Sequence, residues 1–242
     1  QKKERESGRA FHNGLIMATV FSVPITIIGW KWAEEIVPFF LSDPLAIELA
    51  IEYTTVVFIS LLFSVYSFVF VGFYTGVEKT KLHMKVTVIS NLINLYLNAA
   101  LIYGSEGIDV FFKEVLPGFS FLSVLWSWTT FPAMGVKGAA TATLIASAWM
   151  VFHYFFYLFS GDVKKRFKIF SFSYDRAMMQ RQLTLAVPMG VQECIIAFGW
   201  TCFLKVVGII GIVELATTHI IFTIMHASFM PAMGVGMACS TL

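Results

Sequence analysis

Six long apolar stretches, separated by shorter polar segments, dominate the pattern along the chain. A helix needs roughly 20 predominantly apolar residues to cross the hydrocarbon core of a bilayer. Six stretches have or approach that length, and their approximate bounds are residues 11–30, 53–73, 86–103, 138–159, 183–207 and 216–238. The pattern therefore predicts an all-α fold, a polytopic membrane bundle of six transmembrane helices.

A further apolar run covers residues 119–131 and contains Trp126 and Trp128. The run is too short to cross a bilayer comfortably, and tryptophan is enriched where a membrane meets water. We expect it to form an interfacial or partly re-entrant helix.

The composition supports a membrane protein. Apolar residues make up 57% of the 242 positions and charged residues only 13%, about half the charged fraction of an ordinary soluble domain. These values exclude a disordered chain, a nucleic-acid binder and a soluble enzyme domain. The three cysteines lie inside apolar stretches and match no metal-binding or disulfide spacing.

Lys and Arg gather in alternate connections between the predicted spans. They precede the first span, separate the second from the third, and separate the fourth from the fifth: Lys2, Lys3, Arg5, Arg9, Lys79, Lys81, Lys85, Lys164, Lys165, Arg166, Lys168, Arg176 and Arg181. The opposite connections are mostly acidic. Because cytoplasmic loops carry the excess of Lys and Arg, we expect both chain ends in the cytoplasm and the bundle in a plasma membrane of the bacterial inner-membrane type.

The longest basic connection, residues 160–182, is the best candidate for a domain boundary. We predict four transmembrane helices in residues 1–159, a cytoplasmic loop over 160–182 and two transmembrane helices in 183–242. The chain begins at Gln1 without an initiator methionine and stops just after an apolar stretch. We expect it to be an internal piece of a longer membrane protein.

The third span carries three carboxamides on one helix face. Asn91, Asn94 and Asn98 are spaced by three and four residues, which places them on the same side of a helix. Facing lipid without partners, each would cost free energy, so we expect this face to turn inward. It could supply hydrogen bonds between helices, or it could form the polar wall of a substrate or ion cavity.

Glu193 is an acidic residue inside the fifth apolar stretch. It lies ten residues after Leu183, roughly 15 Å into the helix and near the middle of a bilayer. Pro188 and Gly190 precede it and favour a local bend. A carboxylate at this depth needs a partner, a proton or water. It could bind a coupling ion or a cationic substrate, with Gln192 beside it, or it could be a structural carboxyl.

The remaining patterns point to helix packing rather than catalysis. Gly138, Ala142 and Ala146 repeat every four residues in the fourth span, and such small-residue faces let helices approach closely in lipid. The sequence contains no zinc-protease motif, no phosphate-binding loop and no nucleophile paired with a base. We therefore predict that the protein is not an enzyme.

Several motifs, in their order and spacing along essentially the whole chain, resemble multidrug and toxic compound extrusion (MATE) transporters. They are Gly76-Val-Glu-Lys-Thr80-Lys81, Asn94-Leu-Tyr-Leu-Asn98-Ala-Ala-Leu-Ile-Tyr-Gly104, Gly135-Val-Lys-Gly138-Ala-Ala-Thr-Ala-Thr143, Val207-Gly208-Ile-Ile-Gly211-Ile-Val-Glu-Leu-Ala216 and Met230-Pro231-Ala-Met-Gly234-Val-Gly236-Met-Ala238. The family has twelve helices in two six-helix lobes, and this chain resembles helices three to eight. The resemblance implies that the first two and last four helices belong to the remainder of a full-length chain.

The resemblance also implies roles for individual residues. Asn94, Asn98 and Thr143 match a polar cluster of the N-terminal lobe that is implicated in proton or sodium coupling. Some members have an aspartate where this chain has Asn98, so proton coupling here would depend more on the absent first helix. Glu193 resembles the acidic residue of helix seven, although it follows its proline more closely than in the family. The connection over residues 105–131 is also longer than the family's.

The implied function is a secondary active antiporter in the membrane lipid. It would export organic cations or other amphipathic compounds in exchange for H⁺ or Na⁺, and it would need no cofactor besides that coupling ion. Two other functions remain open. One is a flippase of related fold that moves lipid-linked oligosaccharides, and the other is a non-transporting membrane scaffold or subunit.

Overall fold

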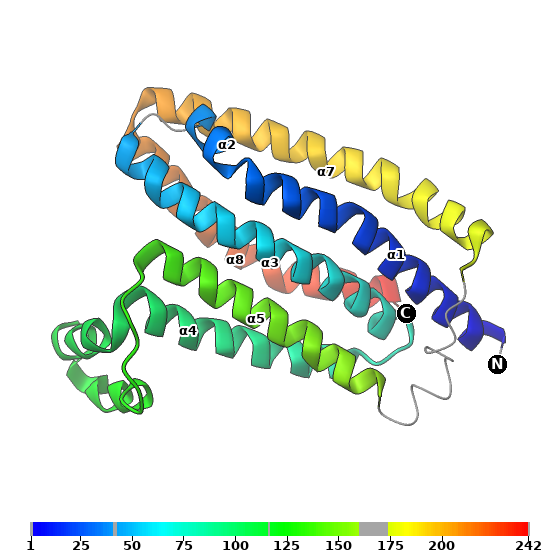
Figure 1. Ribbon diagram of the computed structural model, residues 1–242, viewed down its shortest axis with the longest axis horizontal. Helices are drawn as coiled ribbons and strands as arrows, with labels where there is room; N and C mark the ends of the chain where they lie inside the picture. The colour runs from blue at the N-terminus through cyan, green and yellow to red at the C-terminus, as the bar shows by residue number, and fades with distance from the viewer. Residues whose placement is uncertain (1, 41–42, 116, 160–173, 242) are drawn as a thin grey trace. The chain divides into compact units, whose positions relative to one another are not determined.

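The computed structural model describes residues 2–40, 43–115, 117–159 and 174–241 of the chain (Figure 1). These residues form seven α-helices and one 3₁₀ helix, and the described part contains no β-strand. The elements are α1 (Lys2–Lys31), α2 (Ala33–Phe40), α3 (Pro44–Gly76), α4 (Thr80–Glu114), the 3₁₀ helix η1 (Pro117–Trp126), α5 (Gly135–Leu158), α7 (Arg176–Ile210) and α8 (Ile212–Thr241).

Six of the described helices, namely α1, α3, α4, α5, α7 and α8, are long and apolar enough to cross a membrane. This confirms the prediction of an all-α, multi-pass membrane bundle. The helices extend beyond the apolar stretches, because polar residues at their ends continue the helical backbone. Two of them begin at an aspartate N-cap: Asp43 accepts a hydrogen bond from the Leu45 N–H of α3, and Asp175 accepts one from the Met178 N–H of α7.

The chain divides into two compact units, residues 1–174 and 175–242. Most of the connection predicted as an inter-lobe loop, residues 160–173, lies outside the described residues.

Unit 1 has α3 packed between α1 and α5, with α4 against the far side of α5 (Figure 1). Its core contains Phe11, Phe70, Phe73, Tyr74, Val86, Tyr154 and Leu158. The Tyr74 hydroxyl donates to the Tyr154 carbonyl oxygen at 3.0 Å, which ties the end of α3 to the end of α5. The start of α1 also lies here, because Phe11 packs on Phe70 and Phe73.

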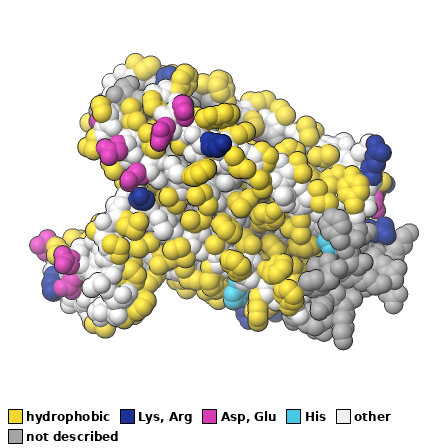
Figure 2. Space-filling view, viewed as in Figure 1, with side chains coloured by type: hydrophobic (Ala, Val, Ile, Leu, Met, Phe, Trp, Pro, Cys, Tyr) yellow, Lys and Arg dark blue, Asp and Glu magenta, His cyan; other side chains and the backbone are white. Residues whose placement is uncertain are grey.

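We call this end of unit 1 the basic end. It consists of the start of α1, the end of α3, the start of α4 and the end of α5. Arg9, Lys79, Lys81 and Lys85 lie there, together with the acidic Glu6 and Glu78. Figure 2 shows apolar side chains along the flanks of the helices and charged side chains mostly near helix ends. Several large apolar side chains are strongly exposed, including Phe68 at 71% and Phe152 at 69%. Such a surface fits lipid or further helices rather than water.

Helix α4 changes direction at Gly104, whose φ of 69° and ψ of 172° are not helical. This positive φ favours glycine, which has no Cβ. In a regular helix the Leu101 carbonyl would accept a hydrogen bond from the Ser105 N–H. The break at Gly104 removes that hydrogen bond. The Met134 N–H, on the chain returning from η1, donates to that carbonyl at 2.8 Å, and the Ser105 N–H donates to the Phe131 carbonyl at 3.2 Å.

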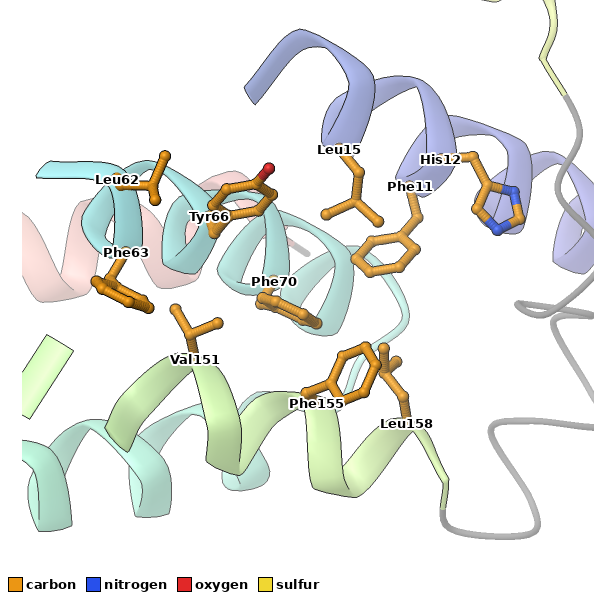
Figure 3. Close-up of a pocket in the computed structure, with 10 residues that line it drawn as sticks. All are labelled: Phe11, His12, Leu15, Leu62, Phe63, Tyr66, Phe70, Val151, Phe155 and Leu158. Carbon is orange, nitrogen blue, oxygen red and sulfur yellow. The ribbon is translucent and has the colours of Figure 1, made fainter. Parts of the chain in front are cut away.

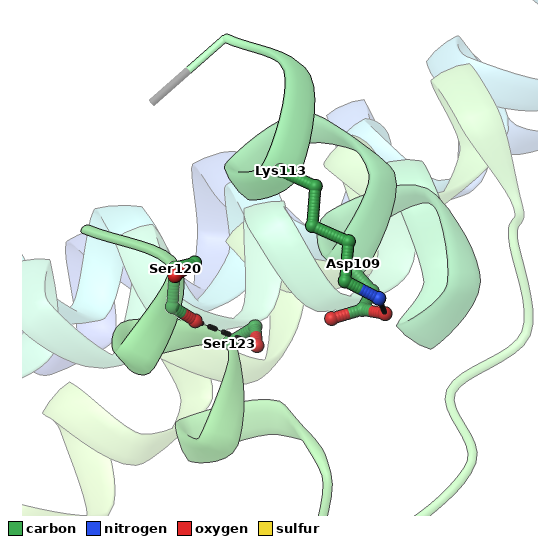
Figure 4. Close-up of polar contacts among 4 residues, drawn as sticks. All are labelled: Asp109, Lys113, Ser120 and Ser123. Atoms are coloured by element: carbon green, nitrogen blue, oxygen red, sulfur yellow. Dashed lines mark hydrogen bonds and ion pairs between the residues drawn. The ribbon is translucent and has the colours of Figure 1, made fainter. Parts of the chain in front are cut away.

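The apolar run predicted as an interfacial or re-entrant helix is a 3₁₀ helix that ends at Trp126, so the expected helix over 119–131 is shorter and tighter. The segment folds back along α4. The Trp126 indole donates to the Tyr96 carbonyl at 3.1 Å and stacks on the Tyr96 ring, while the Trp128 indole donates to the Tyr96 hydroxyl. Nearby, the Lys113 ammonium donates to Asp109, and the Ser123 hydroxyl donates to the Ser120 carbonyl (Figure 4).

Unit 2 consists of α7 and α8, which pack through aromatic rings. Trp200 lies edge-on to Phe222 with ring centroids 4.4 Å apart, and Phe203 contacts the same ring. Most side chains of both helices are exposed within the unit. Two apolar helices of this kind obtain most of their burial from lipid or from other helices.

Candidate functional site

Helices α4 and α5 approach each other very closely. Gly138, Ala142 and Ala146 are buried, as their four-residue spacing predicts for a packing face. A Cβ atom on Gly138 would lie only 2.2 Å from the Leu101 carbonyl oxygen, so only glycine fits. Further along, the Ser90 hydroxyl of α4 donates to the Ala146 carbonyl at 3.0 Å. Asn91, Asn94 and Asn98 lie on one helix of this α4–α5 seam, and Thr143 lies on the other.

The structure joins two of the three predicted carboxamides. Asn98 Nδ2 donates to Asn94 Oδ1 at 2.9 Å, and both side chains are half-buried beside the seam. Asn91 is exposed, one turn nearer the basic end. Thr143 on α5 is half-buried, and its hydroxyl donates to the Ala139 carbonyl of its own helix at 3.0 Å. Among the described residues, no hydrogen bond links Asn91 or Thr143 to the asparagine pair.

The asparagine pair keeps unused bonding capacity. Each carboxamide has an oxygen with two lone pairs and two N–H donors, and the single bond between Asn98 and Asn94 occupies one donor and one lone pair. The Asn98 oxygen and the second lone pair of the Asn94 oxygen can therefore face a cation or a polar substrate. A carboxamide does not titrate, so this pair can ligate Na⁺ through oxygen but cannot itself carry a transported proton.

Glu193 and Gln192 lie on α7 in unit 2. Glu193 is the central residue of this 35-residue helix, and both side chains are exposed within the unit. The predicted bend does not interrupt the helix, which runs continuously through Pro188. A proline removes one backbone hydrogen bond, and here the flanking turns keep the helix intact.

The pairing of α7 with α8 gives the direction of the two helices. Trp200 contacts Phe222, and a Cβ atom on Gly208 would lie 3.8 Å from Leu215, so the two helices run antiparallel. Trp200 is seven residues from Glu193, which places the two side chains on the same face of α7.

One polar network was not predicted from the sequence. His83 Nδ1 lies 2.7 Å from the Tyr154 hydroxyl and 3.2 Å from the Thr87 hydroxyl, at the basic end. The four-residue spacing of His83 and Thr87 was a weak signal, but the partner Tyr154 comes from another helix. No group of three or more metal-ligating side chains occurs in the described part of the chain.

Comparisons with known proteins give the family context. The MatE family model matches residues 1–100, a range that contains α1, α2, α3 and the asparagine pair of α4. A curated protein of Thermotoga maritima, named "Probable multidrug resistance protein NorM", is 26% identical over 177 residues. That alignment covers 72% of this chain and 32% of the relative, so the chain matches about a third of the relative's length. The search of solved structures gave no significant match.

The family match includes the asparagine pair in the first part of α4, and the alignment with the relative is longer than the family match. Together, the MatE match and the NorM relative connect this chain by similarity with the MATE family of transporters.

Proposed function

We propose that the chain is part of a secondary active transporter that exports organic cations or other amphipathic compounds in exchange for H⁺ or Na⁺. The MatE match and the name of the relative support multidrug efflux as the activity. The main structural support for the proposal is the half-buried Asn94–Asn98 pair. It lies in the region that the family model matches, and it retains oxygen atoms that can bind a cation. Transport, not catalysis, is the activity proposed.

The two groups of candidate residues have different chemical capacities. The asparagine pair, with Thr143 on the neighbouring helix, can ligate Na⁺ through oxygen atoms. Glu193 is the candidate that can gain and lose a proton, and its negative charge can also attract a cationic substrate. Competition between ion and substrate for such groups would couple their opposite movements, while the lobes of the full-length chain expose the site to each side in turn.

We further propose that the basic end faces the cytoplasm, that the membrane is a bacterial inner membrane, and that the remaining helices of the full-length chain complete the two lobes. The alternation of charged connections supports the orientation.

The test uses the full-length transporter in energised vesicles, with ethidium as the exported cation. Glu193→Gln is expected to abolish the part of efflux driven by a proton gradient, and Asn98→Leu the part driven by a sodium gradient. Glu214→Gln, at the exposed first turn of α8, is the matched control and should export normally. Wild-type efflux by both Glu193→Gln and Asn98→Leu, at equal expression, would remove these residues from the coupling mechanism.

A further inference from the structure

An apolar cavity of about 530 Å³ lies between α1, α3 and α5 (Figure 3). Side chains from the three helices point into the same space, among them Phe11, Leu15, Phe63, Phe70, Val151 and Phe155. Polar atoms come only from His12 and Tyr66 in the lining, and the Tyr66 hydroxyl is already bonded to Thr19 at 2.6 Å. The cavity has the size of a small-molecule site but offers few polar contacts.

The cavity is only partly enclosed. Its floor is made of nearly inaccessible side chains, with Phe11 at 3% and Phe70 at 2% exposure. Its rim on α5 includes Phe155, which is 45% exposed. In a chain that spans a membrane, an apolar opening along the flank of a helix can admit an acyl chain from the bilayer.

The cavity lies in the half of unit 1 nearest the basic end. Its lining comes from the early turns of α1, the later turns of α3 and the last turns of α5. One leaflet contributes about half of the hydrocarbon core of roughly 30 Å. The depth of the cavity therefore matches the acyl chains of the leaflet that contacts the basic end.

Arg9, Lys79, Lys81 and Lys85 outnumber the acidic Glu6 and Glu78 at the basic end, which suits an anionic headgroup. Arg9 precedes the lining residue His12 by three residues on α1, so the two share a helix face. Lys79 is the N-cap residue of α4, and Lys81 and Lys85 follow within the first two turns. Basic pockets between transmembrane helices are recognised binding sites for anionic phospholipids.

Water and vacuum are poor occupants of such a space. A buried water needs two to four polar partners, and this lining is almost entirely apolar. An empty space would deprive the lining of dispersion contacts. We propose that the cavity between α1, α3 and α5 binds one acyl chain of an anionic phospholipid, whose headgroup lies beside Arg9 and the lysines that begin α4. This site does not depend on the transport activity.

The first experiment measures lipid retention. The purified chain is equilibrated with equal amounts of dioleoylphosphatidylglycerol and dioleoylphosphatidylcholine, and retained lipid is counted by native mass spectrometry. The wild type should retain one phosphatidylglycerol in preference to phosphatidylcholine. Val151→Trp fills the cavity and should lose that lipid, whereas Leu95→Trp, on the exposed face of α4, should keep it. Arg9→Gln should reduce the preference for phosphatidylglycerol about fivefold, the effect expected of one basic side chain at a membrane surface.

The second experiment needs no altered cavity, so it remains informative if Val151→Trp misfolds. Phosphatidylglycerol with a diazirine on one acyl chain is photolysed with the wild-type protein, and the labelled peptides are mapped. Labelling should concentrate on the cavity segments of α1, α3 and α5, and unlabelled phosphatidylglycerol should suppress it.

Three outcomes would overturn the proposal. Equal retention of both lipids would mean only unspecific boundary lipid. Labelling spread over exposed sites such as Phe68 and Leu95 would place the acyl chain elsewhere. Displacement of the lipid by ethidium, with no preference for phosphatidylglycerol, would make the cavity a substrate site instead.

Discussion

Asn98 donates a hydrogen bond to Asn94 at 2.9 Å, one turn away on the same helix. Hydrogen bonds between side chains inside membrane proteins average about 0.6 kcal/mol in double-mutant cycles, with a maximum near 1.7. For Asn94→Ala and Asn98→Ala we therefore expect a coupling free energy in that range, measured from unfolding in detergent micelles. Strictly additive losses would show that the two carboxamides act independently. Asn91→Ala, at an exposed position, should couple to neither residue.

The close contact between Gly138 and Leu101 gives a second prediction. Gly138→Ala places a methyl group against a backbone carbonyl, and overpacking of this kind costs about 1–3 kcal/mol in unfolding free energy. Gly72→Ala is the matched control, because no atom lies within 4 Å of the added methyl group and alanine is the better helix former. Equal stability of the two variants would contradict the close approach of α4 and α5.

Tyr96 holds the segment after α4 through its hydroxyl, which accepts from the Trp128 indole and donates to the Leu125 carbonyl at 2.9 Å. Tyr96→Phe removes both bonds, each worth about 0.5–1.5 kcal/mol. Amide hydrogen exchange in residues 117–134 should accelerate by about tenfold or more. Tyr103→Phe, at a 55% exposed position, should leave exchange unchanged. Unchanged exchange in Tyr96→Phe would show that ring stacking and the backbone hydrogen bonds hold the segment without the hydroxyl.

The buried hydroxyl of Tyr154 links helices at the basic end. Tyr154→Phe removes its bond to His83 while keeping the ring in the core, so unfolding free energy should fall by about 0.5–1.5 kcal/mol. The double variant Tyr154→Phe/His83→Ala should lose less unfolding free energy than the sum of the losses in the two single variants. Tyr53→Phe, at a 40% exposed site, serves as the control and should be neutral.

The number and type of the long helices could be predicted because apolar length alone determines whether a helix can cross a bilayer. The ends of these helices could not be predicted, since charged residues such as those at the start of α1 continue the helix beyond the apolar stretch. Helix α2 was missed for a related reason: its eight residues combine Glu34 and Glu35 with Pro38, a mixture that resembles a loop. The Gly104 break depends on contacts with Phe131 and Ala133, which lie far away in sequence.

The candidate site was only partly accessible to sequence reasoning. The spacing of Asn94 and Asn98 predicted a shared face, and the structure shows them bonded to each other. Their role in coupling, like that of Glu193, Gln192 and Thr143, stays a prediction. The cavity could not be predicted from the sequence. Phe11, Phe70 and Phe155 look like ordinary apolar positions along the chain, and they meet only because three helices pack together.

The glycine at the α4–α5 seam also constrains how the molecule can move. Helices packed through long side chains can slide by exchanging rotamers, but Gly138 has no side chain to exchange where it meets Leu101. We therefore expect the two helices to move together and Asn94, Asn98 and Thr143 to keep a constant spacing. In the transport cycle proposed here, this helix pair is a fixed half-site, and ion binding and release depend on moving elements that complete it or withdraw from it.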